Sequence, residues 1–222
     1  MSTTFCVEID WDHNGTWTDE SAYVRRVQSR SGFESAGDPV AEVGRCTITL
    51  DNTSRRFSPG NGSSALAGKL LPRRAVRVRA INGGQSWTLF RGFIERLEPD
   101  TSVRGAGDAR LECVDAIALL ARQRLSVAHA ETELVSVVVA DIVSTVYTPP
   151  ATAYHDNGDC LNHVGYAWQP VHTTALDALR DVSHAVYGRF FVALDGTPSF
   201  ITRDQVQNPT ITAAAVFGDG AE

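Results

Sequence analysis

The chain has 222 residues, of which 43% are hydrophobic and 21% are charged, and its formal net charge is −6. This composition is ordinary for a globular protein with one or two cores, and it argues against a disordered or fibrous chain. No apolar run approaches the roughly 20 residues of a membrane span, and the N-terminus MSTTFCVEID lacks the basic patch and apolar core of a signal peptide. We therefore expect a protein that has no membrane span and is made in a cytoplasm.

The first half of the chain alternates polar and apolar residues as β-strands do. Turn sequences such as HNG, SAGDP, DNTS, NGG and RGAGD interrupt the alternation. The strands that we expect cover residues 4–10, 21–30, 42–51, 74–81, 86–97 and 108–114. Six strands at this spacing predict a small β-barrel or sandwich over residues 1–114.

The stretch IDWDHNGTWTDES, after the first expected strand, resembles a calcium-binding loop. Asp10, Asp12, Asn14 and Gly15 match positions 1, 3, 5 and 6 of the EF-hand pattern, where oxygen ligands converge around a glycine turn. The pattern should close with a bidentate Glu at position 12, but Ser21 stands there.

The flanks of this stretch also differ from an EF-hand, because they have the pattern of strands and not of helices. A β-hairpin explains the residues better: Asp and Asn side chains would bond their own backbone, and Gly15 would adopt a positive φ. A calcium ion bound by Asp10, Asp12 and Asn14 stays the alternative.

The connection over residues 51–73, DNTSRRFSPGNGSSALAGKLLPR, is longer than ordinary hairpin loops. Loops of this length usually serve a function or an interface. Its apolar residues Phe57, Leu66 and Leu70 are expected to anchor it to the core.

Charge is unevenly distributed along the chain. Residues 55–96 contain nine Lys or Arg and a single acid, Glu95, whereas residues 125–222 contain three Arg and eleven Asp or Glu. Arg77 and Arg79 alternate with core positions and have no aromatic residues between them, which argues against a nucleic-acid site. The pattern favours a basic surface that meets an acidic one, in the same chain or in a neighbour.

Helical periodicity begins after residue 114. We expect one helix over 115–125 with Asp115 as its N-cap, and another over 132–147 after a Thr132 cap, although the valines of the second segment leave a strand open. The clearest helix covers 174–187, with Thr173 or Thr174 as its cap and Gly188 at its C′ position.

A hairpin should follow that helix, since RFFVALDGTPSFITR alternates on both sides of Asp195-Gly196. The second half is therefore expected to be helical with one β-hairpin. The whole chain is predicted to be α+β, with an N-terminal small β-barrel followed by this helical region.

Motifs for catalysis are absent from the sequence. It contains no G-x-S-x-G elbow, and Gly68-Lys69 is followed by Leu70, so the phosphate-loop pattern fails. The residues His155, Asp159, Cys160 and His163 are zinc-ligand types, but their spacing matches no common zinc module, and an exposed loop is favoured. The cysteines in expected strands are predicted to be buried free thiols. These observations favour a binding or structural role and no enzymatic one.

Several motifs occur in an order that resembles the phage tail hub family, which is related to the central baseplate hub and tail-associated proteins of long-tailed phages. After the Asp-rich hairpin come a "TxxLDNxxxRFSP" segment at Thr47 to Pro59, an Arg-bearing strand at Leu71 to Ala80, and an "LFxGxIxxxxP" strand at Leu89 to Pro99. A further match is a "DGxxxFxxR" turn after a helix, formed by Asp195, Gly196, Phe200 and Arg203.

The resemblance implies a structural component of a phage or prophage tail tip that caps the tail tube and forms the channel for DNA delivery. It implies a homotrimer in the virion tail tip, made in the host bacterial cytoplasm. The implied partners are the tail tube or a distal tail protein ring, the tape-measure protein, and DNA in transit. No cofactor is implied.

The implied organisation has a β-barrel tail-hub domain over 1–114, an α+β hub domain over 115–205, and the start of a further segment over 206–222. The loop over 51–73 and the strand after it become candidates for contacts between subunits. Those candidate residues are Arg55, Arg56, Phe57, Arg73, Arg74, Arg77 and Arg79.

Overall fold

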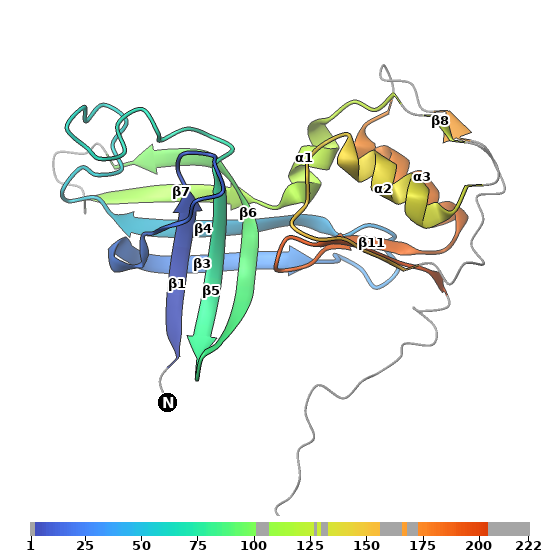
Figure 1. The fold of residues 1–222 in the computed structure, drawn as a ribbon, viewed down its shortest axis with the longest axis horizontal. Coiled ribbons are helices and arrows are strands. Elements are labelled where there is room, and N and C mark those ends of the chain that lie inside the picture. The colour runs from blue at the N-terminus through green and yellow to red at the C-terminus, as the bar shows by residue number, and fades with distance from the viewer. Residues whose placement is uncertain are drawn as a thin grey trace, which may run out of the picture.

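The computed structural model describes residues 3–100, 107–126, 128–129, 133–155, 166–167 and 173–203. Two lobes lie side by side (Figure 1). We call residues 3–114 the β lobe and residues 115–203 the helical lobe. None of the helices in the described ranges is long and apolar enough to cross a membrane.

The β lobe is built on one seven-stranded antiparallel sheet with the order β2-β1-β5-β6-β7-β4-β3. Its strands are β1 (Thr4–Asp10), β2 (Thr18–Asp19), β3 (Val24–Gly32), β4 (Glu42–Asp51), β5 (Ala75–Asn82), β6 (Gln85–Pro99) and β7 (Asp108–Val114). A short 3-10 turn, η1 (Ser21–Tyr23), joins the two edge strands β2 and β3.

Alternate residues of these strands form a single core, as their polar and apolar alternation predicted. The sheet curls, so that inward-facing side chains from β1, β4, β5, β6 and β7 meet in one cluster. Its strand residues include Val7, Ile9, Ile48, Leu50, Val76, Val78, Phe90, Ile94 and Leu111. No pairing in the described part of the chain links β3 back to β1 or β2, so a closed barrel stays a prediction.

Strand β6 connects the two halves of the sheet. Its first part pairs with β5 and its last part with β7, and Phe93 pairs with Ala75 on one side and Val114 on the other. Gly92 allows this bend, because a Cβ there would lie 2.2 Å from the carbonyl oxygen of Val114. In Figure 1, β1 and β5 accordingly run across the direction of β3, β4 and β7.

The helical lobe contains three helices and a three-stranded sheet of order β11-β12-β9. The helices are α1 (Ala116–Arg122), α2 (Val135–Ser144) and α3 (Ala175–Ala185). The strands are β9 (Ala153–His155), β11 (Arg189–Val192) and β12 (Pro198–Ile201), and a separate two-stranded pair joins β8 (Ala128–His129) to β10 (Tyr166–Ala167). Apolar faces of the helices form a second core with Phe190 and Phe200 of the sheet.

The three predicted helices are confirmed. Asp115 caps α1 by accepting a hydrogen bond from the backbone N–H of Ile117. Helix α2 begins after Leu134, and no side chain caps it. Thr174 caps α3 in a capping box with Asp177. Of the two predicted caps, Thr173 and Thr174, the structure has Thr174.

The end of α3 differs from the prediction for Gly188. Tyr187, and not the glycine, adopts the left-handed conformation, with φ of 51°. The N–H of Gly188 bonds the carbonyl of Ser183, and that of Tyr187 bonds the carbonyl of His184, which is the Schellman pattern. Gly188 serves the packing instead, because a Cβ there would lie 2.6 Å from the ring of Phe200.

The predicted hairpin across Asp195-Gly196 is confirmed as β11 and β12, with φ of 87° at Gly196. The sequence did not indicate that β9 would pair in parallel with β12. A segment of the β lobe also crosses over: Val40 bridges Phe190 and is buried in the core of the helical lobe. The two lobes are thus joined by more than the covalent link at residue 115.

Candidate functional site

The Asp-rich stretch forms a hairpin between β1 and β2. The two carboxylate oxygens of the buried Asp10 accept hydrogen bonds from the backbone N–H groups of Asn14, at 3.2 Å, and Gly15, at 2.8 Å. Asn14 accepts from the N–H of Thr16, and Gly15 has a φ of 83°. These are the backbone bonds that the hairpin hypothesis predicted.

The other calcium candidate, Asp12, faces a different partner. Its carboxylate pairs with the ammonium group of Lys69 at 2.8 Å, and both side chains are largely exposed. The three side chains proposed as calcium ligands therefore each bond a group of the protein. Calcium binding at these residues stays the alternative hypothesis.

The long connection over residues 51–73 is anchored as expected. Phe57 and Leu66 are buried, and Leu70 packs against the same core. The buried Asn52 organises the start of the loop, because its side-chain oxygen accepts from the N–H of Phe57 and its amide donates to Ser58. Asn52 was not singled out by sequence reasoning, although it belongs to the LDN motif of that segment.

Four of the nine basic residues in the stretch 55–96 pair with acidic residues early in the chain. Glu8 receives bidentate hydrogen bonds from the guanidinium groups of both Arg77 and Arg79, at 2.7 to 3.2 Å. Burial alone would raise the pKa of Glu8, but the two guanidinium groups outweigh it and the pKa is lowered. The predicted contact between the basic stretch and an acidic surface therefore occurs within the chain at Glu8. The acidic partner does not come from residues 125–222.

Arg56 has a buried partner in Glu20, whose side chain is 0% exposed. The carboxylate of Glu20 accepts from two nitrogens of Arg56, at 2.7 and 3.1 Å, and from the indole N–H of Trp11, at 2.9 Å. The guanidinium group of Arg56 also lies over the rings of Tyr23 and Phe57. Arg56 therefore holds the long loop against the hairpin.

The interface candidates divide into inward and outward residues. Phe57 is fully buried in the core of its own lobe, as its anchoring role predicted, so its ring presents no exposed surface to a neighbouring subunit. Arg77 and Arg79 are half-buried, and both form ion pairs with Glu8. Arg55 and Arg73 are exposed, and the structure gives neither side chain an ion pair within the described residues.

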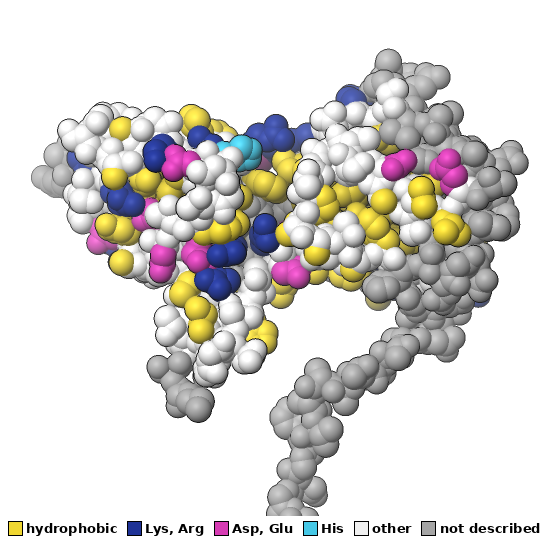
Figure 2. Space-filling view, viewed as in Figure 1, with side chains coloured by type: hydrophobic (Ala, Val, Ile, Leu, Met, Phe, Trp, Pro, Cys, Tyr) yellow, Lys and Arg dark blue, Asp and Glu magenta, His cyan; other side chains and the backbone are white. Residues whose placement is uncertain are grey.

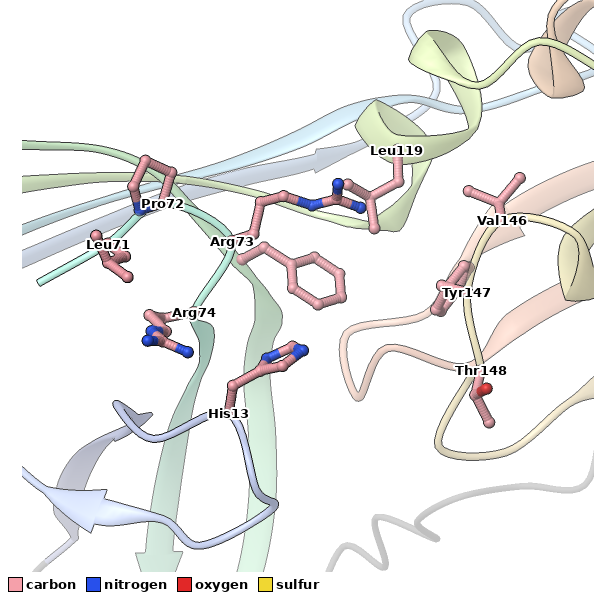
Figure 3. A pocket seen from close by; sticks show the side chains of 10 residues that line it. His13, Leu71, Pro72, Arg73, Arg74, Leu119, Val146, Tyr147 and Thr148 are labelled. Atoms are coloured by element: carbon pink, nitrogen blue, oxygen red, sulfur yellow. The ribbon is translucent and has the colours of Figure 1, made fainter. Parts of the chain in front are cut away.

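A groove of about 610 Å³ lies between the two lobes, and we call it the inter-lobe groove. It is lined by His13, Leu71, Pro72, Arg73, Arg74, Phe93, Leu119, Val146, Tyr147 and Thr148. Figure 3 shows Arg73 reaching across it toward Leu119, with Tyr147 and Thr148 on the opposite wall. The groove therefore combines an apolar wall with a cationic rim.

Sequence reasoning identified Arg73 and Arg74 but missed the groove, because its walls come from five separate segments of the chain. The ring of Phe93 on β6 contacts the ring of Tyr147 edge-on, with centroids 6.4 Å apart, and so joins the lobes at its floor. Burial raises the pKa of Tyr147. Hence its hydroxyl is neutral at physiological pH, and the positive charge of the groove comes from the arginines.

Arg91 makes a second contact between the lobes and also lies beside Trp17 of its own lobe, a residue that the sequence analysis missed. The guanidinium groups of Arg77 and Arg91 lie 4.3 and 5.5 Å from the centre of its ring. Arg91 in turn approaches the β11–β12 turn so closely that a Cβ on Gly196 would lie 2.9 Å from its side chain. Arg91 thus packs between the two lobes.

The zinc candidates cannot be compared with the structure, because residues 156–165 and the side chain of His155 lie outside what it describes. Within the described residues, no group of three or more His, Cys, Asp or Glu side chains comes together as a metal site would require. Cys46 and Cys113 are buried free thiols, as predicted, whereas Cys6 is a free thiol that is only partly buried. Burial raises the pKa of Cys46 to about 12.

No protein-family model matches the sequence, and no curated protein matches it. Solved structures do match its fold. A tail protein from Neisseria meningitidis MC58 superposes on 90% of this chain with a TM-score of 0.61 and 14% sequence identity. The 43 kDa tail protein of prophage MuSo2 from Shewanella oneidensis superposes on 90% with a TM-score of 0.57 and 10% identity.

The chain spans about half the length of these two structures, 51% and 53%. The match runs through both lobes, since it covers nine-tenths of the chain. The resemblance noted from the sequence motifs is thereby confirmed at the level of fold. The chain has the fold of phage tail proteins.

Proposed function

We propose that the chain is a structural component of the tail tip of a phage or prophage, a baseplate hub that caps the tail tube and forms the channel for DNA delivery. The observation that carries the proposal is the superposition of 90% of the chain on two tail proteins. The ordered hub motifs support it independently, because they are a property of the sequence and not of the superposition.

In this proposal three copies form a ring at the virion tail tip, and the β lobe contributes a barrel-like wall to each third of the ring. The partners are the tail tube or distal tail protein ring and the tape-measure protein, with DNA passing through the lumen. The ion pairs of Glu8 and Glu20 are compatible with DNA passing through without binding tightly. They neutralise arginines that could otherwise bind DNA phosphates.

The test is the mass of the purified chain in solution, measured by light scattering over a range of concentrations. A trimer of three times 24.0 kDa supports the proposal. Antibodies against the chain should then label the tail tip of particles that carry it, in negative-stain micrographs. Labelling along the whole tail tube, or on the capsid, would overturn the assignment to the tip.

A further inference from the structure

Arg73, which lines the inter-lobe groove, has an unfavourable backbone conformation. Arg73 has a φ of 65°, a left-handed conformation that costs a residue with a Cβ on the order of 1 kcal/mol or more. Backbone bonds between Arg73 and Ile94 and between Arg74 and Ile94, at 2.7 and 2.8 Å, hold this conformation. The result is an exposed guanidinium group at the groove without an ion pair among the described residues.

Helix α2 carries an acid in a locally unfavourable position. Asp141 lies in the last turn of the helix, where the helix dipole disfavours a negative charge. Its side chain is exposed, and within the described ranges the structure gives its carboxylate no cationic partner. Neither charge is neutralised by an ion pair among the described residues, so both are available to a partner outside the chain.

Each of these charges has an exposed apolar neighbour. Val137 lies one helical turn before Asp141 on the same face of α2 and is 45% exposed. In the groove, Leu71 is 50% exposed and lies two residues before Arg73. The outward face of α2 therefore presents an apolar residue and an acid, and the groove presents an apolar residue and a base.

The two surfaces of one chain cannot meet each other. The opposite face of α2, with Val139 and Val143, is buried in the core of the helical lobe, so the helix cannot turn its outward face toward its own groove. Figure 2 shows the same separation, with Lys and Arg side chains at the junction of the lobes and acidic side chains out on the helical lobe.

We infer that the outward face of α2 docks in the inter-lobe groove of a second copy of this chain, with Asp141 beside Arg73 and Val137 against Leu71. The inference rests on the proposed function, because it supplies the contact through which copies assemble. The docked surfaces are different from each other, so successive copies add head to tail, and such an interface forms a ring when its rotation closes. Complementary charges fix the register of the contact, and the apolar pair removes surface from water.

Charge reversal tests the contact. Arg73→Glu should lower the association constant at least tenfold and shift the mass toward that of the monomer, and Asp141→Arg should do the same. The double variant Arg73→Glu with Asp141→Arg should recover assembly, since the pair is then restored with opposite sign. Arg26→Glu is the control, because Arg26 is also exposed and has no ion pair in the described part of the chain, and it lies on β3, away from the groove. It should assemble like the wild type.

A pair of cysteine variants distinguishes an error in the proposed contact from an error in the proposed trimer. Leu71→Cys and Val137→Cys chains, mixed and oxidised, should form a disulfide between copies that neither variant forms with wild-type chains. Wild-type trimers without this cross-link, and with no effect of Arg73→Glu, would overturn the contact and leave the proposed function standing. A cross-link between chains whose wild-type mass is that of a dimer would support the contact and overturn the trimer. If the chains form no cross-link and do not assemble, both the contact and the proposed trimer are overturned.

Discussion

Gly44 and Asp115 exchange two hydrogen bonds between the end of the β lobe and the start of the helical lobe. The N–H of Gly44 donates to the carboxylate of Asp115 at 2.9 Å, and the N–H of Asp115 donates to the carbonyl of Gly44 at 2.9 Å. The same carboxylate caps α1 through the N–H of Ile117. One side chain therefore fixes both the beginning of a helix and its position beside strand β4.

Gly44→Ala should destabilise the protein by about 2–3 kcal/mol through overpacking. A Cβ at this position would lie 2.5 Å from the carboxylate oxygen of Asp115, and that side chain cannot move without losing its bonds. Urea unfolding monitored by circular dichroism gives the measurement. Gly37→Ala is the control, because nothing lies within 4 Å of a Cβ there. Equal stability of the two variants would contradict this role of Gly44.

Asp115 should make stability depend on pH. Its burial raises the pKa to about 7, although N–H donors from Gly44, Ile117 and Ala118 oppose the rise. Because the folded pKa lies above the unfolded value near 4, the folded state binds more protons between these values. Stability from this group is complete below about pH 4 and is lost as pH rises through about 7.

The comparison is with Asp115→Asn, which cannot titrate. The unfolding free energy of the wild type, minus that of the variant, should fall by a few kcal/mol, in order of magnitude, between pH 4 and pH 7. The asparagine loses one acceptor for the backbone, which lowers its stability at every pH by a constant amount. A difference that does not change with pH would show that the carboxyl titrates normally in the folded protein.

Tyr187→Gly should stabilise the protein by about 0.5–1 kcal/mol, because glycine adopts the left-handed C′ conformation without a steric cost. Tyr187 is 73% exposed, so little packing is lost, although the guanidinium group of Arg203 lies 5.7 Å from the centre of its ring. Tyr187→Ala removes the same ring and keeps the backbone strain, and it should not stabilise. Thermal unfolding of the three proteins distinguishes strain from ring contact.

Asp10→Ala should lower the unfolding free energy by about 1–2 kcal/mol even in the presence of a chelator, because two backbone N–H groups lose their acceptor. Asp12→Asn should cost less than about 1 kcal/mol, since its ion pair with Lys69 is exposed. Calcium should leave the melting temperature of the wild type unchanged relative to magnesium. A calcium-specific increase that Asp10→Ala abolishes would instead establish the calcium-dependent alternative.

Glu20→Ala should cost about 2–4 kcal/mol, because it leaves the indole N–H of Trp11 and the partly buried Arg56 without their acceptor. Glu98→Ala removes an acid that pairs with Arg96 at the surface, and it should cost less than about 1 kcal/mol. Chemical unfolding of both variants provides the comparison. Similar losses would mean that the Glu20 network adds nothing beyond an ordinary surface pair.

The strands were the most predictable part of the fold. Those expected at 4–10, 42–51 and 108–114 have the same bounds in the structure, because alternation of buried and exposed residues is a local signal. The short strand β2 carried no such signal, and its two residues are exposed. The parallel pairing of β9 with β12 was also missed, since pairing between distant segments leaves no pattern in either one alone.

The candidate site was less predictable than the fold. The motif resemblance identified Arg73, but no local pattern places it beside Leu119 and Tyr147, which reach the groove from the other lobe. Phe57 was expected to anchor its loop and was also a candidate for a contact between subunits, and its buried ring confirms the anchoring role. Ion-pair partners such as Glu8 and Arg77 are 69 residues apart, and only the register of β1 with β5 brings them together.

Strand β6 gives the β lobe a mechanical property. Since one continuous strand pairs with β5 through its first part and with β7 through its last, a force that pulls β5 away from β7 is transmitted along a covalent backbone. Separation then requires many backbone hydrogen bonds to shear together, and not one after another from an end. The β2 edge of the sheet is held less firmly, because β2 contributes only two paired residues.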